Sequence, residues 1–81
     1  MEARERLLRL ARRKGAGYVA RVPRIPSCDI RWCSRDAVVD ARTVYGFWGY
    51  LCYPHFMSLG VGLGIGKGQV LVLDSEEGPR G

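Results

Sequence analysis

The sequence predicts a small α+β domain that a metal stabilises, with a basic helix at its N-terminus. The chain has only 81 residues, and a domain of this size buries only about 60% of the surface that its unfolded chain exposes. Such a domain usually needs a disulfide set, a metal or a partner to be stable. Three cysteines and the only histidine have the spacing of metal ligands, and an arginine-rich amphipathic segment precedes two segments typical of a β-hairpin.

Residues 2–14 are predicted to form the helix, because apolar side chains recur there at three- and four-residue spacing. Gly15 and Gly17, which follow, are typical of the end of a helix. Residues 18–26 contain two prolines, so we expect an extended segment there that is not a central strand of a sheet.

Two strand-like segments follow in the middle of the chain. Residues 37–44 are rich in valine and threonine, residues 47–51 contain three aromatic side chains, and the turn residue Gly46 lies between them. The two segments are therefore predicted to pair as a hairpin.

The last part of the chain is predicted to contain a short helical turn over residues 55–59 and a final strand over residues 69–73. From residue 74 onward the chain is acidic and contains glycine and proline, so we expect it to be disordered. The chain thus divides into a basic helix or arm over residues 1–17, a module carrying the cysteines over residues 18–73, and a disordered acidic tail over residues 74–81.

Positive charge is concentrated in the first half of the chain. Residues 1–42 contain 11 basic and 5 acidic residues, a net charge of +6, whereas residues 43–81 have a net charge of −1. Eleven of the 13 basic residues are arginine, which makes forked contacts with phosphate and carboxylate groups. This pattern indicates a polyanionic partner or an acidic protein surface, or else simply a solvated helix face. The residues predicted to contact a partner are Arg4, Arg6, Arg9, Arg12, Arg13, Arg24, Trp48, Tyr50 and Lys67.

Cys28, Cys33, Cys52 and His55 form a C-x4-C pair and a C-x2-H pair separated by 18 residues. Zinc prefers four sulfur or nitrogen ligands at the corners of a tetrahedron. Two close pairs joined by a hairpin would supply this geometry, so we expect a zinc-ribbon-like β-hairpin module. Because four protein ligands leave no position for water, the Zn²⁺ ion would be structural and not catalytic.

Other interpretations of these residues remain open. A disulfide framework would leave one of the three cysteines unpaired. All three could instead be buried free thiols, since cysteine packs as a small apolar residue. Cys52 could be a nucleophile with His55 as its base, although no third orienting group accompanies them. If Cys33 is not a ligand, a bound metal would keep an open position.

Glycine alternates with other residues from Gly60 to Gly68. This run matches neither phosphate-binding pattern, G-x-x-x-x-G-K-[ST] or G-x-G-x-x-G, and no complete catalytic constellation is present elsewhere, so we expect a protein that is not an enzyme. The run forms either an extended segment whose glycine face another backbone or a nucleic-acid strand can approach, or a tightly packed irregular loop.

Residues 43–66 form a stretch of 24 residues without Asp, Glu, Lys or Arg. A stretch of this length can span a bilayer as a helix. Six glycines, Pro54 and His55 within it oppose that interpretation, because lipid leaves polar and helix-breaking groups without partners. A single membrane span is therefore a weaker alternative.

Seven of the eight aromatic residues lie between residues 32 and 56, where we expect them to surround the metal. Side chains along residues 47–51 alternate between the two faces of the predicted strand. Either Phe47 or the pair Trp48 and Tyr50 can therefore be exposed, for stacking on bases or for contact with a partner.

Several motifs lie between residues 26 and 73: the first cysteine pair, Asp40-Ala-Arg-Thr43, Gly46-Phe-Trp-Gly49, Cys52-Tyr-Pro-His55-Phe56, and the glycine run that ends at Gln69. In these motifs the chain resembles a group of small proteins of uncharacterised function that are common in tailed bacteriophages and actinobacterial genomes. Its first cysteine pair is wider than the usual C-x2-C of that group, and Phe47 replaces the usual proline. The resemblance implies a zinc-ribbon-like module and a phage origin, and no established activity.

We therefore predict a non-enzymatic zinc-binding module that binds nucleic acid through its arginine-rich arm. The alternative is an interaction module that docks on a larger host or viral assembly, such as RNA polymerase, a defence complex or a virion. The first 14 residues are charged throughout and lack the apolar core of a secretory signal, so we expect a cytoplasmic protein, in the host cytoplasm if a phage encodes it.

Overall fold

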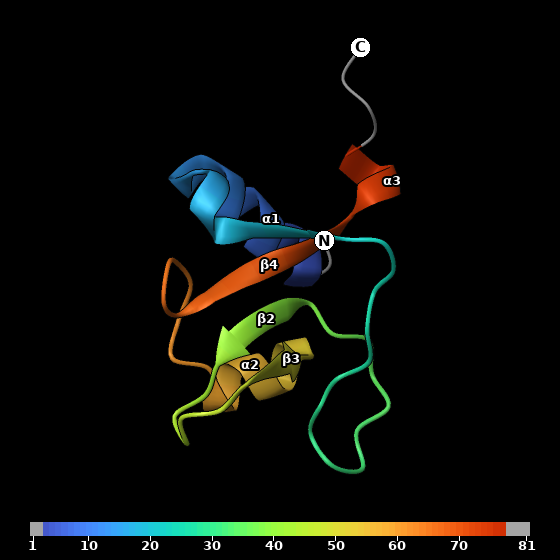
Figure 1. Cartoon of the computed structure of the whole chain (residues 1–81), viewed down its shortest axis with the longest axis vertical. Helices are drawn as coiled ribbons and strands as arrows, with labels where there is room; N and C mark the ends of the chain where they lie inside the picture. The colour runs from blue at the N-terminus through green and yellow to red at the C-terminus, as the bar shows by residue number, and fades with distance from the viewer. Residues whose placement is uncertain (1–2, 78–81) are drawn as a thin grey trace.

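The computed structural model describes residues 3–77 and places them in one small α+β unit. Two helices of more than one turn and one four-stranded sheet make up most of it (Figure 1). The elements are α1 (Ala3–Lys14), the 3₁₀ turn η1 (Ala16–Tyr18), β1 (Val19–Val22), β2 (Val39–Arg42), β3 (Trp48–Leu51), α2 (Tyr53–Leu59), β4 (Gly68–Leu73) and the single helical turn α3 (Asp74–Glu77).

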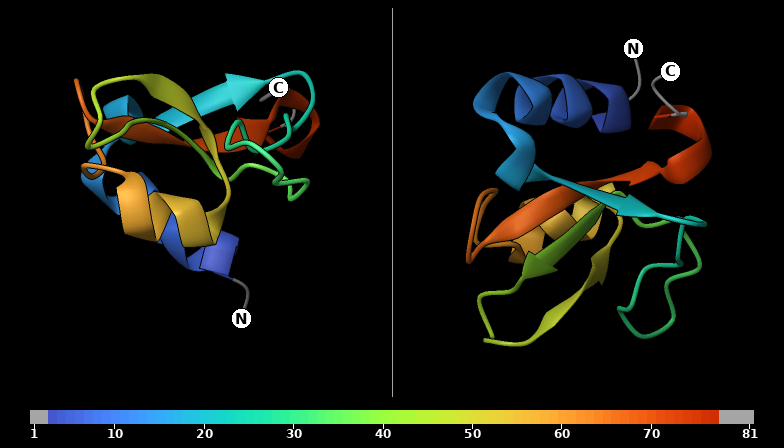
Figure 2. Two further views of the ribbon diagram at one scale, coloured as in Figure 1. Left: turned by 90° about the horizontal axis from the view of Figure 1, so that it is seen from below. Right: turned by 45° about the horizontal axis from the view of Figure 1, so that its top comes forward.

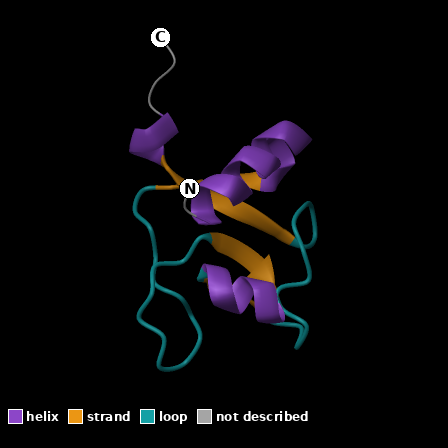
Figure 3. Cartoon of the chain, turned by 180° about the vertical axis from the view of Figure 1, so that it is seen from behind, coloured by secondary structure: helices purple, strands orange, loops and turns teal. Residues whose placement is uncertain are grey.

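The sheet is mixed, with the strand order β1-β4-β2-β3. Strands β2 and β3 form an antiparallel hairpin in which Arg42 is paired with Trp48, and β4 is antiparallel to β2 on its other side. Strand β1 lies parallel to β4 at one edge of the sheet. The view from behind shows both long helices in front of the strands (Figure 3).

Helices α1 and α2 cover the same face of the sheet and leave the other face open (Figure 2). The core lies between the covered face and the helices, where Ala11 of α1 and Phe56 of α2 meet Val39, Leu51 and Val70 of the strands. Leu7 and Leu8 of α1 pack against this cluster, so α1 is part of the folded unit and presents its basic residues from a fixed position.

Local sequence patterns explain most element boundaries. The helix predicted for residues 2–14, the hairpin strands predicted within residues 37–44 and 47–51, and the final strand correspond to α1, β2, β3 and β4. The segment with two prolines contains β1, which is an edge strand and ends at Val22, immediately before Pro23. Helix α2 begins at Tyr53, two residues earlier than predicted, because Pro54 fits the first turn of a helix.

The segment predicted as a disordered tail starts differently from that expectation. Its first four residues form the helical turn α3, and Asp74 at the start of this turn lies 3.8 Å from the guanidinium of Arg21 on β1. An acidic residue at the start of a helical turn also suits the helix dipole. Residues 78–81, together with residues 1–2, lie outside the described part of the chain.

The glycine run forms a packed irregular loop and not an extended segment. Gly62, Gly64 and Gly66 adopt positive φ angles of 141°, 122° and 80°, which only glycine adopts readily. At Gly64 a Cβ atom would lie 3.2 Å from the ring of Tyr18, and at Gly68 it would lie 2.8 Å from the Cβ of Ala41. The glycines therefore allow the loop to approach η1 and β2 closely.

The uncharged stretch of residues 43–66 contains the hairpin turn, β3, α2 and most of the glycine loop, and it does not form one helix. Among residues 3–77, none of the helices has the length and apolar character needed to cross a membrane.

Substitutions in the glycine loop test this packing. We expect Gly68→Ala to reduce the free energy of unfolding by about 1–3 kcal/mol, because the added methyl group overlaps Ala41 and the carbonyl of Gly62. Gly66→Ala meets no neighbouring atom within 4 Å and should cost only the strain of its positive φ, roughly 1–2 kcal/mol. Urea denaturation measures the free energy of unfolding of both variants. If Gly68→Ala were as stable as the unsubstituted protein, the close packing of Gly68 against Ala41 would be contradicted.

Candidate metal centre

Cys28 and Cys33 lie in the loop between β1 and β2, which folds back on itself. The Cys28 N–H donates to the carbonyl of Arg35 at 2.8 Å, and the Ala37 N–H donates to the carbonyl of Pro26 at 2.9 Å. At the tip, the Cys33 N–H donates to the carbonyl of Ile30 at 3.0 Å and closes a tight turn. These hydrogen bonds hold both thiols on the side of the loop that faces Cys52 and His55.

The tight turn places Trp32 at a positive φ angle. Its φ angle is 69°, the only positive φ of a non-glycine residue among residues 3–77, and such a conformation costs roughly 1–2 kcal/mol for an L-residue. The indole is 94% exposed, so no packing of the side chain compensates this cost. Sequence patterns do not predict this role, because a tryptophan carries no turn signal.

Cys52 and His55 come from the junction of β3 and α2. Cys52 is the residue immediately before α2, and its carbonyl accepts the N–H of Phe56 at 2.8 Å. His55 lies in the first turn of α2, which brings its Nδ1 atom to 3.2 Å from the Cys52 Sγ atom. The C-x2-H spacing therefore produces one compact ligand pair.

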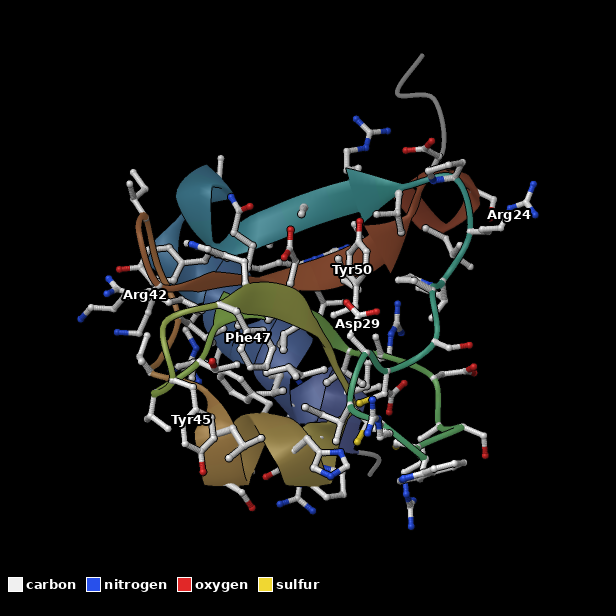
Figure 4. The ribbon with its side chains drawn as sticks, turned by 60° about the horizontal axis from the view of Figure 1, so that its bottom comes forward. Arg24, Asp29, Arg42, Tyr45, Phe47 and Tyr50 are labelled. Atoms are coloured by element: carbon white, nitrogen blue, oxygen red, sulfur yellow. The ribbon has the colours of Figure 1, made fainter. Side chains whose placement is uncertain are left out.

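Asp29 joins the two pairs. Its N–H donates to the carbonyl of Tyr50 at 2.7 Å, and its carboxylate accepts the N–H of Tyr50 at 2.8 Å. Because Tyr50 lies two residues before Cys52 and Asp29 follows Cys28, these bonds place the loop beside the end of β3. Figure 4 shows Asp29 and Tyr50 near each other, with the ring of Tyr50 pointing away from the sulfur atoms.

The four ligand atoms of Cys28, Cys33, Cys52 and His55 all lie within 4.8 Å of one another. The Cys33 and Cys52 Sγ atoms are 3.8 Å apart, and Cys28 Sγ lies 3.5 Å from the Nδ1 atom of His55. Bond lengths of about 2.3 Å for Zn–S and 2.1 Å for Zn–N give a tetrahedron with edges of about 3.6–3.8 Å. A disulfide would require about 2 Å between the sulfurs, so this cluster fits a four-coordinate metal ion and not a disulfide.

The protein prepares the thiols unequally for metal binding. The backbone N–H of Arg35 lowers the pKa of the Cys33 thiol, although its partial desolvation opposes this. Burial raises the pKa of Cys52 to about 11, while the backbone N–H of His55 acts in the opposite direction. A metal ion must displace the Cys52 proton, so acid should weaken metal binding.

The same facts argue against Cys52 as a nucleophile. His55 is close enough to act as a base, but the thiol is buried and its pKa is raised, whereas reactive cysteines have lowered pKa values and partial exposure. Four protein ligands around one ion also leave no open coordination position. The arrangement can hold a metal ion and thereby connect a loop, a strand end and a helix.

The residues predicted to contact a partner do not form one surface. Five of them lie on α1, where Arg6, Arg9, Arg12 and Arg13 are exposed and Arg4 donates to the carbonyl of Leu71 at 3.4 Å. Arg24 is exposed after the end of β1, and Lys67 is exposed in the glycine loop. Trp48 and Tyr50 lie on the open face of the sheet, because Gly49 and Leu51 between and beyond them are buried. The predicted set therefore combines residues from two opposite faces.

In comparisons with protein-family models, curated proteins and solved structures, nothing matches this chain, so the functional inferences rest on its own residues.

Asp40 lies on the open face, in register with Tyr50 on one side and Gln69 on the other. Its partial burial, and then the negative charge of Asp29, raise the pKa of the Asp40 carboxyl. The folded protein therefore binds this proton more tightly than the unfolded chain does, so ionised Asp40 destabilises the fold. This cost is fully present above the raised pKa and diminishes as pH falls through it.

We predict that metal analysis of the purified protein gives close to one zinc ion per chain and that a strong chelator unfolds it. Cys52→Ser should prevent folding, because it removes a buried ligand, while Ser58→Ala on the exposed side of α2 should fold normally. Circular dichroism and metal content measure both effects. An unchanged spectrum in excess chelator would refute the metal centre.

Asp40→Asn should increase the free energy of unfolding at pH 7, because it removes the partly desolvated charge and its repulsion with Asp29. The gain should shrink as pH is lowered toward the range where Asp40 is protonated. Urea denaturation of the zinc-loaded protein at several pH values measures it, with the exposed Asp36→Asn as control. A gain that grows on acidification would show that the sign is wrong.

Proposed function

We propose that this protein is a non-enzymatic module, stabilised by a structural zinc ion in a zinc-ribbon-like arrangement, that binds nucleic acid through the basic face of α1. The observation that carries the proposal is the convergence of Cys28, Cys33, Cys52 and His55 within 4.8 Å. Three thiol groups and one imidazole form a typical structural zinc ligand set. The ligand pairs connect segments that share few buried apolar side chains, which is the role expected of a structural ion in a domain of this size.

The geometry of α1 supports the choice of nucleic acid. Ala11 is fully buried against the sheet, and on the opposite side of the helix the side chains of Arg6, Arg9 and Arg13 are exposed in one row. Helical rise spreads this row over about 10 Å, roughly three steps of a nucleic-acid strand at 3.4 Å each. A rigid row of arginines suits phosphates, and it would position the chain without reading base sequence.

A protein partner is the second candidate, because Leu10 is 41% exposed beside the arginines of α1. A helix with an exposed leucine among basic residues fits an acidic groove with an apolar floor. A surface of a larger assembly, such as RNA polymerase, a defence complex or a virion, would then be the ligand.

Binding of the zinc-loaded protein to a fluorescent duplex, followed by anisotropy at several salt concentrations, tests the first candidate. The double variant Arg9→Gln with Arg13→Gln should weaken binding and reduce the slope of log K against log salt by about 2, because each arginine that neutralises one phosphate contributes about one unit. The variant Arg21→Gln with Arg31→Gln removes the same charge elsewhere and should change the slope less.

Absence of any complex with the duplex at about 20 mM salt would refute nucleic-acid binding through α1, because electrostatic affinity is highest there. In that case, recovery of one acidic protein from host lysate, abolished in the Leu10→Ala variant, would support the second candidate.

A further inference from the structure

The end of the open sheet face nearest the β2–β3 turn combines the exposed ring of Trp48 with cations. Trp48 is 51% exposed and is paired in register with Arg42, which is also exposed. The neighbouring Thr43 N–H donates to the carbonyl of Phe47 at 2.8 Å. Because hydrogen-bonded and non-hydrogen-bonded pairs alternate along an antiparallel hairpin, Arg42 and Trp48 form a non-hydrogen-bonded pair. Side chains in such pairs are closest, with Cβ atoms about 4.5–5.5 Å apart.

A second cation lies next to this pair. The Arg42 N–H donates to the carbonyl of Lys67 at 2.8 Å, which places the exposed Lys67 beside Arg42. Phe47 is 46% exposed and Tyr45 is 75% exposed. However, Phe47 alternates with Trp48 along the hairpin and shares the face of the buried Gly49, and Figure 4 shows Phe47 and Tyr45 on the α2 side of β3.

The electrostatics of this end favour an anionic ligand. The hairpin turn, α2 and the glycine loop contribute no acidic residue, because residues 43–66 contain no Asp or Glu. Asp40 lies farther along this face, paired with Tyr50, and Asp29 lies at the edge of the sheet beside Gly49 and Tyr50. Cations therefore dominate next to Trp48, and the acids limit how far a polyanion can extend along the sheet.

We propose that Arg42, Trp48 and Lys67 form a site for unpaired nucleotides of a single-stranded nucleic acid. One base stacks on Trp48, and Arg42 and Lys67 bind the flanking phosphates. This inference rests on the proposed function, because it specifies which class of nucleic acid the protein binds. It uses a separate surface, since α1 covers the opposite face of the sheet.

A duplex fits this site poorly, because its bases are already stacked and paired. Single strands offer a free π face at every base, and stacking on an aromatic side chain contributes about 1–3 kcal/mol per base. The site should therefore select for single strands, whereas the arginine row on α1 should accept both forms.

Trp32→Phe makes the test direct, because Trp32 and Trp48 are the only tryptophans and Trp32 lies on the cysteine loop. In this variant, an oligothymidylate of about twelve nucleotides should quench the fluorescence of Trp48, and a duplex of equal length should quench it much less. Trp48→Leu should weaken binding of the labelled single strand by roughly 5- to 150-fold, the range that corresponds to one stacked base. Trp48→Phe should retain most of the affinity.

Arg42→Gln should weaken single-strand binding and reduce its salt slope by about 0.7. Quenching should persist in the variant Arg9→Gln with Arg13→Gln, which separates this site from α1. Metal content and circular dichroism show that each variant is folded.

Three results would overturn the site: binding of the single strand without quenching, equal quenching by the duplex, or equal weakening for both ligands in Trp48→Leu. The first would mean that the single strand binds elsewhere and does not stack on Trp48. If the duplex fails to bind but the single strand quenches Trp48, the α1 proposal fails and this site stands.

Discussion

The backbone junction between the Cys28 loop and β3 determines where all four ligands lie. Asp29 satisfies both the N–H and the carbonyl of Tyr50, groups that would otherwise face outward from an edge strand. The same contacts protect the free edge of the sheet, which would otherwise be open to pairing with another chain. They also bring the first thiol pair to the start of α2, so ligand geometry and sheet protection depend on one residue.

A bound metal ion would stabilise the part of the chain that contributes little to the apolar core. The core lies between the sheet and the two helices on one face, and the long connection from β1 to β2 contributes only Cys28, Ala37 and Val38 to the buried apolar residues. Ordering each residue of such a segment costs about 1–2 kcal/mol in backbone entropy alone. Zinc binding is strong enough to offset much of this cost.

The helices and strands that depend on local sequence could be predicted from it. Helical spacing located α1, strand-forming composition located β2, β3 and β4, and residue chemistry identified the four residues that could hold a metal ion, because each pair is close in sequence. Contacts across long separations were not predictable: the parallel pairing of β1 with β4 joins Val19 to Val70, and no local signal encodes it. The turn at Trp32 is local, but it was not predicted, because tryptophan is an unusual residue at positive φ.

The fold shows where the unevenly distributed charges of the sequence lie in the molecule. With both helices on one face, the arginines of α1 and the rings of β3 cannot contact the same short ligand segment. The charge-free residues 43–66 build the hairpin end and α2, where only Arg42 and Lys67, which flank that stretch in the sequence, supply charge. The arginines of α1 and the exposed ring of Trp48 thus lie on two different faces of one molecule. On the helical face charge dominates, whereas on the sheet face two cations border the exposed ring of Trp48, so the first suits any phosphate backbone and the second suits bases that are free to stack.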